Sequence, residues 1–456
     1  MVSREPCRRP RRGRGVDFDE MDLKLIALMA AVAAAIVVGV RAARAAAGDD
    51  RPPEVDAQAA AAEEGPVVVP PPSEKALRYD RGGNVIWVVE QFLGLAIPSL
   101  FLFTGFSAML RTFASSLGRG HFYPTLVIYL VAFSLVTSVI QLPLSYYVGY
   151  VREHAFGLST QHLSKWIGDQ VKGALVGLLI GALILWLPYL LLARSPSHWW
   201  LWTGMLSLPL IIIMFLVTPI WIAPLFNKFG PMQDKALEAD VLATASRAGV
   251  EGARVFQVDK SVDTEKVNAY VTGIGNTKRI VLWDTLLKRL SPRQIRFVVG
   301  HELGHYVLGH VVVSIFVSWG LLMLGLYGAH RTADLLLSRF AARFGFTQLS
   351  DVASLPLLML LLSVFSLLIG PATLALSRYH EHEADRFALE LTHDNHGGAS
   401  AFVALQRQNL AVPRPGWLFK LFRASHPPIG ERVDFMNSYR PWEQGAPERY
   451  ADHFRR

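Results

Sequence analysis

The sequence predicts a mainly α-helical membrane protein: a polytopic bundle of about seven spans with a small α+β domain at one membrane face. Of its 456 residues, 52% are hydrophobic and 18% are charged, and the mean hydropathy is +0.30. Such a composition is typical of membrane chains rather than of several soluble domains. Polar sequence gathers in one interval between spans and in the C-terminal tail, so these two parts should form the domain outside the membrane.

Seven stretches approach the length of about 20 apolar residues that crosses a bilayer. They are residues 25–40, 93–110, 124–144, 173–193, 199–226, 311–329 and 353–376. The last four contain no Asp, Glu, Lys or Arg, which argues against buried helices of a soluble protein. The first stretch has a rival interpretation as a cleaved signal sequence, because arginines precede it and small residues follow it. We favour a retained span.

These spans divide the chain into seven parts. In order, they are a basic head (1–21), the first span or signal sequence (22–41), an Ala/Pro-rich linker (42–83), a four-span region (84–226), the first part of the polar domain (227–310), a two-span hairpin (311–376) and the second part of the polar domain (377–456). The linker is rich in Ala, Pro and acidic residues and offers little apolar surface for a core.

The charge pattern argues against a nucleic-acid partner, and the cysteine content limits the kinds of covalent and metal site. The formal net charge of +8 comes without a nucleic-acid-binding motif, so we expect no nucleic-acid partner. Lys and Arg flanking membrane spans explain the positive charge more simply. Cys7 is the only cysteine, which excludes an intrachain disulfide and a cysteine-based zinc site. The oligomeric state stays open.

The polar interval has its own order of elements. Residues 235–249 show helical periodicity, and residues 253–259 and 266–274 are rich in Val and aromatic side chains, which is typical of strands. Residues 278–287 continue as a returning strand that runs into a helix. The run Ser291-Pro292-Arg293-Gln294 then combines an N-cap serine, a first-turn proline and a capping-box glutamine, so a helix should start near Pro292.

The motif HELGH, residues 301–305, lies on this helix. Residues four apart share a helix face, so His301 and His305 can bind one zinc ion at about 2.0–2.1 Å. Glu302 lies about 100° around the helix and can reach a water on the metal without binding the metal itself. This arrangement suits hydrolysis, in which the carboxylate takes the proton of water and later returns it.

A catalytic zinc usually has three protein ligands, so one more must reach the same membrane face. Two antiparallel spans return the chain there, at the sequence SRYHEHEADRFALE, residues 377–390. Glu381 is the candidate third ligand, and Asp385, four residues later, is a candidate partner for an imidazole N–H. Three neighbours stay open as rival ligands by their chemistry: His380, His382 and Glu383.

With these residues in place, the chain resembles the type I CAAX prenyl proteases, a family of seven-span membrane zinc endopeptidases with HExxH and a downstream Glu ligand. Five segments carry the resemblance: PLSYYVGYVREHAFGLS, TPIWIAPLFNKFGPM, NAYVTGIGNTKRIVLWDTLL before HELGH, SRYHEHEAD, and SHPPIGERV at 425–433. It covers most of the chain, from about the second span to the tail. The polar domain would then be a zincin-type metalloprotease domain, and the enzyme would hold one Zn²⁺ per chain.

The resemblance also implies roles for individual residues. His301, His305 and Glu381 would bind zinc, Glu302 would be the general base, and Asp385 would support a ligand histidine. An edge strand would pair with substrate backbone through three residues: Asn268, Ala269 and Tyr270. His426 and Arg432 would bind substrate or the oxyanion of the tetrahedral intermediate. The segment KSVDTEKVNAYVTG departs from the eukaryotic members, which leaves a prenylated substrate as one option among membrane-associated peptides and proteins.

Two alternative functions remain at this point. A quality-control protease that clips misfolded membrane proteins would use the same chemistry without reading a prenyl group. A zinc transporter would use the histidines differently, but transporters usually place ionisable residues inside their spans.

We expect a multi-pass protein of the bilayer, in the plasma membrane if the source is bacterial. The segments before and after the first span contain equal numbers of Lys and Arg, so the positive-inside rule does not decide the orientation of the chain. Translation from Met21 would remove the basic head and place the catalytic face in the cytoplasm, as in the family.

Overall fold

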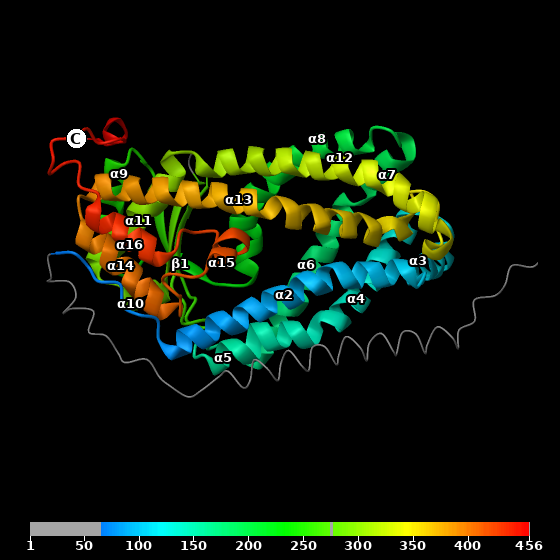
Figure 1. Cartoon of the computed structure of the whole chain (residues 1–456), viewed down its shortest axis with the longest axis horizontal. Helices are drawn as coiled ribbons and strands as arrows, with labels where there is room; N and C mark the ends of the chain where they lie inside the picture. Colours follow the sequence, from blue (N-terminus) through cyan, green and yellow to red (C-terminus); the bar gives the residue numbers. More distant parts are fainter. Residues whose placement is uncertain (1–64, 274–276, 456) are drawn as a thin grey trace, which may run out of the picture.

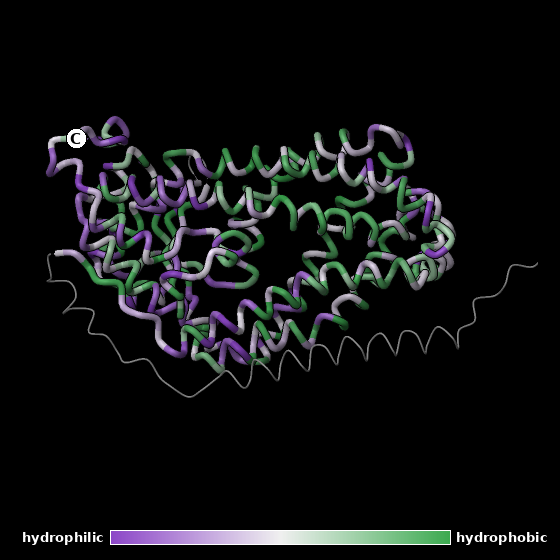
Figure 2. Tube along the Cα trace, in the orientation of Figure 1, coloured by the Kyte–Doolittle hydropathy of each residue, from purple (hydrophilic) through white to green (hydrophobic). Residues whose placement is uncertain are grey.

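The computed structural model of the chain describes residues 65–273 and 277–455. The basic head, the first predicted span and most of the linker lie outside the described residues, so they stay predictions. The described part is elongated, and long helices run from one end of the molecule to the other (Figure 1). The polar domain forms one end, where hydrophilic residues gather in Figure 2, and both ends of the described chain lie there.

Six helical stretches of the described chain are long and apolar enough to cross a membrane, which confirms the helical membrane bundle. They are α2 (Glu74–Phe103), α4 to α5 (Phe122–Ala155), α6 to α7 (Leu163–Arg194), α8 with its closing turns (Trp199–Leu225), α12 (His310–Phe344) and α13 with its leading turn (Val352–Thr392). Within them, α4 is Phe122–Tyr146, α5 is Glu153–Ala155, α6 is Leu163–Ile184, α7 is Trp186–Arg194, α8 is Trp199–Val217 and α13 is Leu355–Thr392.

The first described span starts earlier than the sequence analysis placed it. Helix α2 begins at Glu74, inside the predicted linker, because the Ser73 side chain accepts the backbone N–H of Ala76 and caps the helix. It ends near Gly105, which has a φ of 72°, and the short helix α3 (Phe106–Leu117) follows. The predicted span 93–110 therefore crosses a helix break.

The polar domain contains a mixed four-stranded sheet with the order β1-β2-β4-β3. Its strands are β1 (Phe229–Pro231), β2 (Arg254–Val258), β3 (Ala269–Thr272) and β4 (Arg279–Trp283). Strands β2 and β4 are parallel, and the outer pairs β1–β2 and β3–β4 are antiparallel. Three of the strands were predicted, while β1 was missed because FGP is too short to show alternation. The sheet leaves β3 at one edge, next to the helix that carries HELGH.

Helices α9 (Lys235–Arg247) and α10 (Asp284–Arg289) pack on the sheet, and α11 (Pro292–Val307) carries the motif. The predicted capping box is confirmed: Ser291 and Gln294 each bond the other's backbone N–H. Helix α11 does not run straight into the next span. Gly309 adopts a φ of 68°, which ends one helix and starts α12 at His310.

Small residues bring the motif helix close to the last span. A Cβ on Gly304 would lie 3.1 Å from the Phe387 Cβ and 3.2 Å from the Ala384 Cα, and one on Gly300 would lie 3.5 Å from the Ala388 Cβ. Glycines at these two positions, four apart on one face of α11, therefore let its backbone approach α13 closely. Because α13 is one helix from the membrane to Thr392, this contact holds its polar end against HELGH.

The C-terminal segment wraps the polar end of α13. It comprises α14 (Asn395–Gln408), α15 (Trp417–Phe422), α16 (Ile429–Ser438) and a final turn at Ala451–His453. Buried Glu390 accepts the backbone N–H of Tyr450 at 2.6 Å, and Asn437 of α16 makes two 2.9 Å hydrogen bonds to the backbone of Val67. Residues 65–72 thus run as an extended strap over α14 and α16.

Candidate metal centre

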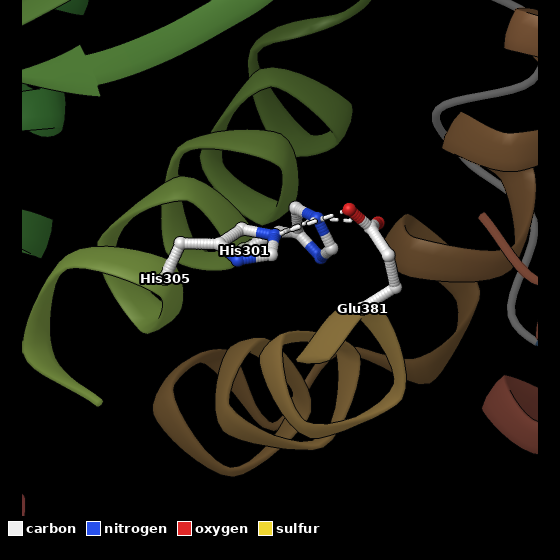
Figure 3. Close-up of side chains that lie close together, drawn as sticks. All are labelled: His301, His305 and Glu381. Carbon is white, nitrogen blue, oxygen red and sulfur yellow. Dashed lines mark hydrogen bonds and ion pairs between the residues drawn. The ribbon is translucent and has the colours of Figure 1, made fainter. Parts of the chain in front are cut away.

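The two motif histidines and Glu381 meet where α11 packs on α13 (Figure 3). His301 Nε2 lies 3.2 Å from His305 Nε2 and 3.3 Å from Glu381 Oε2. His305 Nε2 lies 3.4 Å from Glu381 Oε1. All three side chains point to one spot, although Glu381 comes from a helix 80 residues further along the chain.

This geometry fits a bound metal ion. Ligand atoms about 2.0–2.1 Å from a tetrahedral ion lie about 3.3 Å from one another, which matches the three measured spacings. Glu381 Oε2 is buried and makes no hydrogen bond among the described residues, although His301 and Arg432 lie within ion-pair distance, so this oxygen can still bind a metal ion. Two nitrogens and a carboxylate oxygen form a donor set that suits zinc and other first-row transition metals.

Asp385 and Arg432 support His301 from behind. Asp385 is fully buried; it accepts a hydrogen bond from His301 Nδ1 at 2.9 Å and two from Arg432 at 2.8 and 2.6 Å. Burial opposes the charge of both histidine and arginine, but the carboxylate outweighs it and raises the pKa of His301 to about 10 and that of Arg432 above its ordinary value. Asp385 therefore holds the proton on His301 Nδ1 and orients the ring so that Nε2 lies toward His305 and Glu381.

His305 has a supporting contact of its own, which the sequence analysis did not predict. His310 is buried, and its Nδ1 lies 3.0 Å from Nδ1 of His305. The His310 ring stacks on His380, with centroids 4.3 Å apart and planes 6° apart. The turn at Gly309 makes this contact: it redirects the chain so that the first residue of α12 faces back toward the motif helix.

Glu302 lies beside the two motif histidines on α11, and burial raises the pKa of its carboxyl above the ordinary value. A second contribution comes from Glu381, while His301 and His305 act in the opposite direction. A carboxyl with a raised pKa can hold a proton as well as release it, as a group that transfers protons must.

His426 and Arg432 close the site on the side of the C-terminal segment. His426 Nε2 lies 3.2 Å from Glu381 Oε1, and its Nδ1 lies 2.8 Å from the Ser425 hydroxyl. Arg432 Nη2 lies 3.4 Å from Glu381 Oε2. The His426 side chain remains 59% exposed, so it can meet a ligand from solvent, whereas Arg432 is buried beneath it.

Three further residues singled out in the sequence lie at the sheet edge. Ala269 and Tyr270 are the first two residues of β3, and Asn268 directly precedes the strand. The Asn268 carbonyl accepts the N–H of Trp283 at 3.2 Å, which extends the ladder with β4. Within residues 65–273 and 277–455, no strand pairs with the outer edge of β3, so its backbone groups there are open to another strand.

The rival ligands next to Glu381 have other partners. His380 stacks on His310, and His382 accepts a hydrogen bond from Arg386 at 3.2 Å. Glu383 is buried and accepts from Tyr450 and Arg386, and it pairs with Arg449. Successive residues of a helix point in directions about 100° apart, so the neighbours of Glu381 on α13 face other elements.

Fold and site together define a multi-pass membrane metalloendopeptidase, in which a metal site sits at the end of a bundle of spans. The chain belongs to peptidase family M48: that family's pattern matches residues 231–440, and the pattern of the CAAX prenyl protease N-terminal region, with five membrane helices, matches residues 68–228. It is therefore an enzyme that cleaves peptide bonds and is CAAX prenyl protease-like, which confirms the resemblance found in the sequence. The family assignment favours the protease over the transporter alternative.

Several relatives share most of their length with this chain. An uncharacterized metalloprotease of Bacillus subtilis, YhfN, is 34% identical over 377 residues, which cover 82% of this chain and 86% of that protein. CAAX prenyl protease 1 of Saccharomyces cerevisiae is 30% identical over 328 residues, 67% of this chain and 70% of that protein. The crystal structure of S. mikatae Ste24p has the same fold, with a TM-score of 0.69 at 24% identity, over 91% of this chain and 98% of that one.

Proposed function

We propose that this chain is a zinc-dependent endopeptidase in which His301, His305 and Glu381 bind one Zn²⁺ and Glu302 is the general base. The observation that carries the proposal is the triangle of ligand atoms, with edges of 3.2, 3.3 and 3.4 Å. When bound, the zinc would acidify a water molecule and polarise the scissile carbonyl.

The side chains around the metal centre would divide the remaining tasks. Glu302 takes a proton from the attacking water and gives it to the leaving amine, which its raised pKa supports. His426 and Arg432, both within 3.4 Å of Glu381, stabilise the negative charge that develops on the carbonyl oxygen. Asp385 keeps His301 in the tautomer that presents Nε2.

The substrate would bind as an added strand. The backbone of Asn268, Ala269 and Tyr270 lies at the open edge of the sheet, and an extended peptide can pair with it there. We propose that the substrate is a membrane-associated peptide or protein, with a prenylated peptide as the first candidate, because several relatives are named CAAX prenyl proteases. We further propose that the catalytic end faces the cytoplasm; a reporter at Arg456 that reports a non-cytoplasmic position would contradict this orientation.

The test is peptide cleavage by the purified full chain in detergent, with a farnesylated CAAX peptide and its unmodified copy. Cleavage should require metal, should stop with chelator and return with zinc, and should be lost in Glu302→Gln, which keeps the ligands and removes the base. Faster cleavage of the farnesylated peptide supports a site that reads lipid. Equal cleavage of both peptides refutes prenyl specificity and favours quality control. Full activity in Glu302→Gln refutes the assignment of the base.

A further inference from the structure

Two arginines, called here the sheet arginines, lie side by side on the face of the sheet that turns away from the core of the polar domain. Arg254 of β2 and Arg279 of β4 are register partners, so their side chains leave the sheet on the same face. Both contact the Phe256 ring, with the Cζ atoms 5.5 and 5.4 Å from its centroid. Val255 and Ile280 alternate with these residues and point into the core that the sheet shares with α9 and α11.

The sheet arginines have no counter-charge. In residues 65–273 and 277–455, no carboxylate lies within ion-pair distance of Arg254 or Arg279. The Nε atom of Arg279 is buried and makes no hydrogen bond there. Like charges on neighbouring strands repel each other, and a buried donor without a partner lowers stability. An anion bound between the two guanidinium groups would remove both costs.

The sheet arginines lie where an apolar span ends. Arg279 lines a small pocket together with Pro219 and Ile220, which belong to the turn that closes the span Trp199–Leu225. Trp221, the next residue of this turn, is 73% exposed. Tryptophan is enriched where a span meets the lipid headgroups, and cations at the same depth attract anionic lipids. The pocket is therefore at the level of the headgroups.

A phosphate that carries acyl chains fits this place better than a peptide carboxylate or a free anion. Arg254 stands on β2, two strands in from the open edge of β3, so a peptide added at that edge passes about 14 Å away. Ile213, Leu216 and Ile220 are exposed at the spacing of one helix face along the span. Leu216 and Ile220 also line the pocket with Arg279, so this apolar strip leads to the sheet arginines.

We propose that Arg254 and Arg279 bind the phosphate of an anionic phospholipid, whose acyl chain lies along Ile213, Leu216 and Ile220. Arginine suits this task, because its planar guanidinium group binds a phosphate through two parallel hydrogen bonds. A lipid with a cationic headgroup brings a third positive charge to the pair, so an anionic lipid is preferred. The site is separate from the metal centre and does not depend on the proposed protease function.

The first test measures lipid binding by the purified full chain in a neutral detergent. Phosphatidylglycerol and phosphatidylcholine with brominated acyl chains are titrated, and quenching of tryptophan fluorescence is followed. Phosphatidylglycerol should bind about 10- to 100-fold more tightly, the range that hydrogen bonds to a charged group provide. Trp221→Phe should remove the quenching specific to phosphatidylglycerol, because this side chain lies beside the pocket.

Substitutions of the sheet arginines test their role in this preference. Arg254→Gln/Arg279→Gln should abolish the preference for phosphatidylglycerol, and Arg254→Lys/Arg279→Lys should keep part of it, because lysine retains the charge without the planar fork. Arg414→Gln is the matched control, since it removes one exposed arginine, paired with Asp434, and should retain the preference.

Two results of this test overturn the proposal. One is equal affinity of the wild-type chain for phosphatidylglycerol and phosphatidylcholine. The other is a preference that survives in Arg254→Gln/Arg279→Gln while that variant keeps the wild-type melting temperature.

A second measurement separates a lipid phosphate from other anions. The melting temperature of the full chain is compared with added phosphatidylglycerol, phosphatidylcholine and inorganic phosphate, each with zinc and with chelator. Phosphatidylglycerol should raise it most, only when both arginines are present, and by the same amount in chelator. An equal rise with inorganic phosphate would assign the pair to a soluble anion and overturn the proposal. So would a cleavage preference for acidic peptides that depends on Arg279 in a chain that shows no lipid preference. If the chain cleaves no peptide, the proposed function fails while the lipid measurements still decide on the site.

Discussion

Replacement of Asp385 by Asn tests whether the buried carboxylate stabilises the fold around Arg432 and orients His301 for metal binding. Asp385 accepts two hydrogen bonds from Arg432 and one from His301, and it is fully buried. Asparagine keeps the shape but removes the charge, and its amide can accept on one side only. Arg432 would then be a buried cation with Glu381, 3.4 Å away, as its remaining anionic partner among the described residues.

The expected cost has two parts. Breaking a buried ion pair by removing one partner costs about 3–5 kcal/mol of folding free energy. Loss of the hydrogen bond that orients a ligand histidine weakens metal affinity by about 10- to 100-fold, which corresponds to about 1.4–2.7 kcal/mol. The two effects are separable, because the first is present in chelator and the second is seen only with metal.

The assay is unfolding of the detergent-solubilised protein by SDS titration, with and without chelator, together with zinc competition against a chelating dye. Asp434→Asn is the matched control, since Asp434 also accepts two hydrogen bonds from an arginine, Arg414, but both side chains are 57% exposed. An exposed pair contributes about 0–1 kcal/mol. The double variant Asp385→Asn/Arg432→Met should recover most of the lost stability, because it removes the unpaired charge. Equal losses for Asp385→Asn and Asp434→Asn would refute the reasoning.

Three further predictions concern other parts of the molecule. His310→Leu removes the partner of His305 Nδ1 and should lower the zinc affinity, measured by dye competition, about 10- to 100-fold. His310→Gln keeps an acceptor at this position and should lower the zinc affinity less. A His310→Leu variant that binds zinc as tightly as wild type would show that the contact does not orient His305. Burial would raise the pKa of Asp284, but hydrogen bonds from Ser261 and Lys288 outweigh it and lower the pKa to about 2, so this residue's contribution is present above pH 4 and is lost as the pH falls toward 2. The gap in melting temperature between wild type and Asp284→Asn should therefore shrink between pH 5 and pH 2, and a constant gap would contradict this assignment. Asn437→Ala removes both hydrogen bonds to Val67 and should lower the free energy of unfolding by about 1–2 kcal/mol. It should also make residues 65–72 more sensitive to limited proteolysis. Unchanged proteolysis would show that other contacts hold this segment.

Local patterns in the sequence predicted much of the fold and the centre of the site. Helical spacing placed His301 and His305 on one face, and the count of spans returned Glu381 to the same membrane face. The capping box at Ser291 located the start of α11, and segments rich in Val and aromatic residues, with the returning segment after them, located three of the four strands. These features depend on residues close together in the chain, so the sequence can indicate them directly.

The contacts that the sequence did not show join distant segments or depend on one backbone angle. His310 stands at the start of an apolar span, and the left-handed Gly309 turns it toward His305. Residues 65–72 look like the end of a polar linker, yet amide side chains from the C-terminal segment bind their backbone. Nothing in the linear order of residues indicates either contact.

The continuity of α13 has a mechanical consequence. At 38 residues the helix is about 57 Å long, so one continuous helix, with Pro371 inside it, extends from the apolar span to Glu381 and beyond. The motif histidines stand on α11, which Gly309 uncouples from its own span. Because Gly300 and Gly304 hold α11 against α13, a tilt of α13 that matches the thickness of the surrounding lipid carries the motif helix with it. Bilayer thickness thereby acts on the orientation of the whole metal centre relative to the membrane, while the spacing of the three ligand atoms is kept.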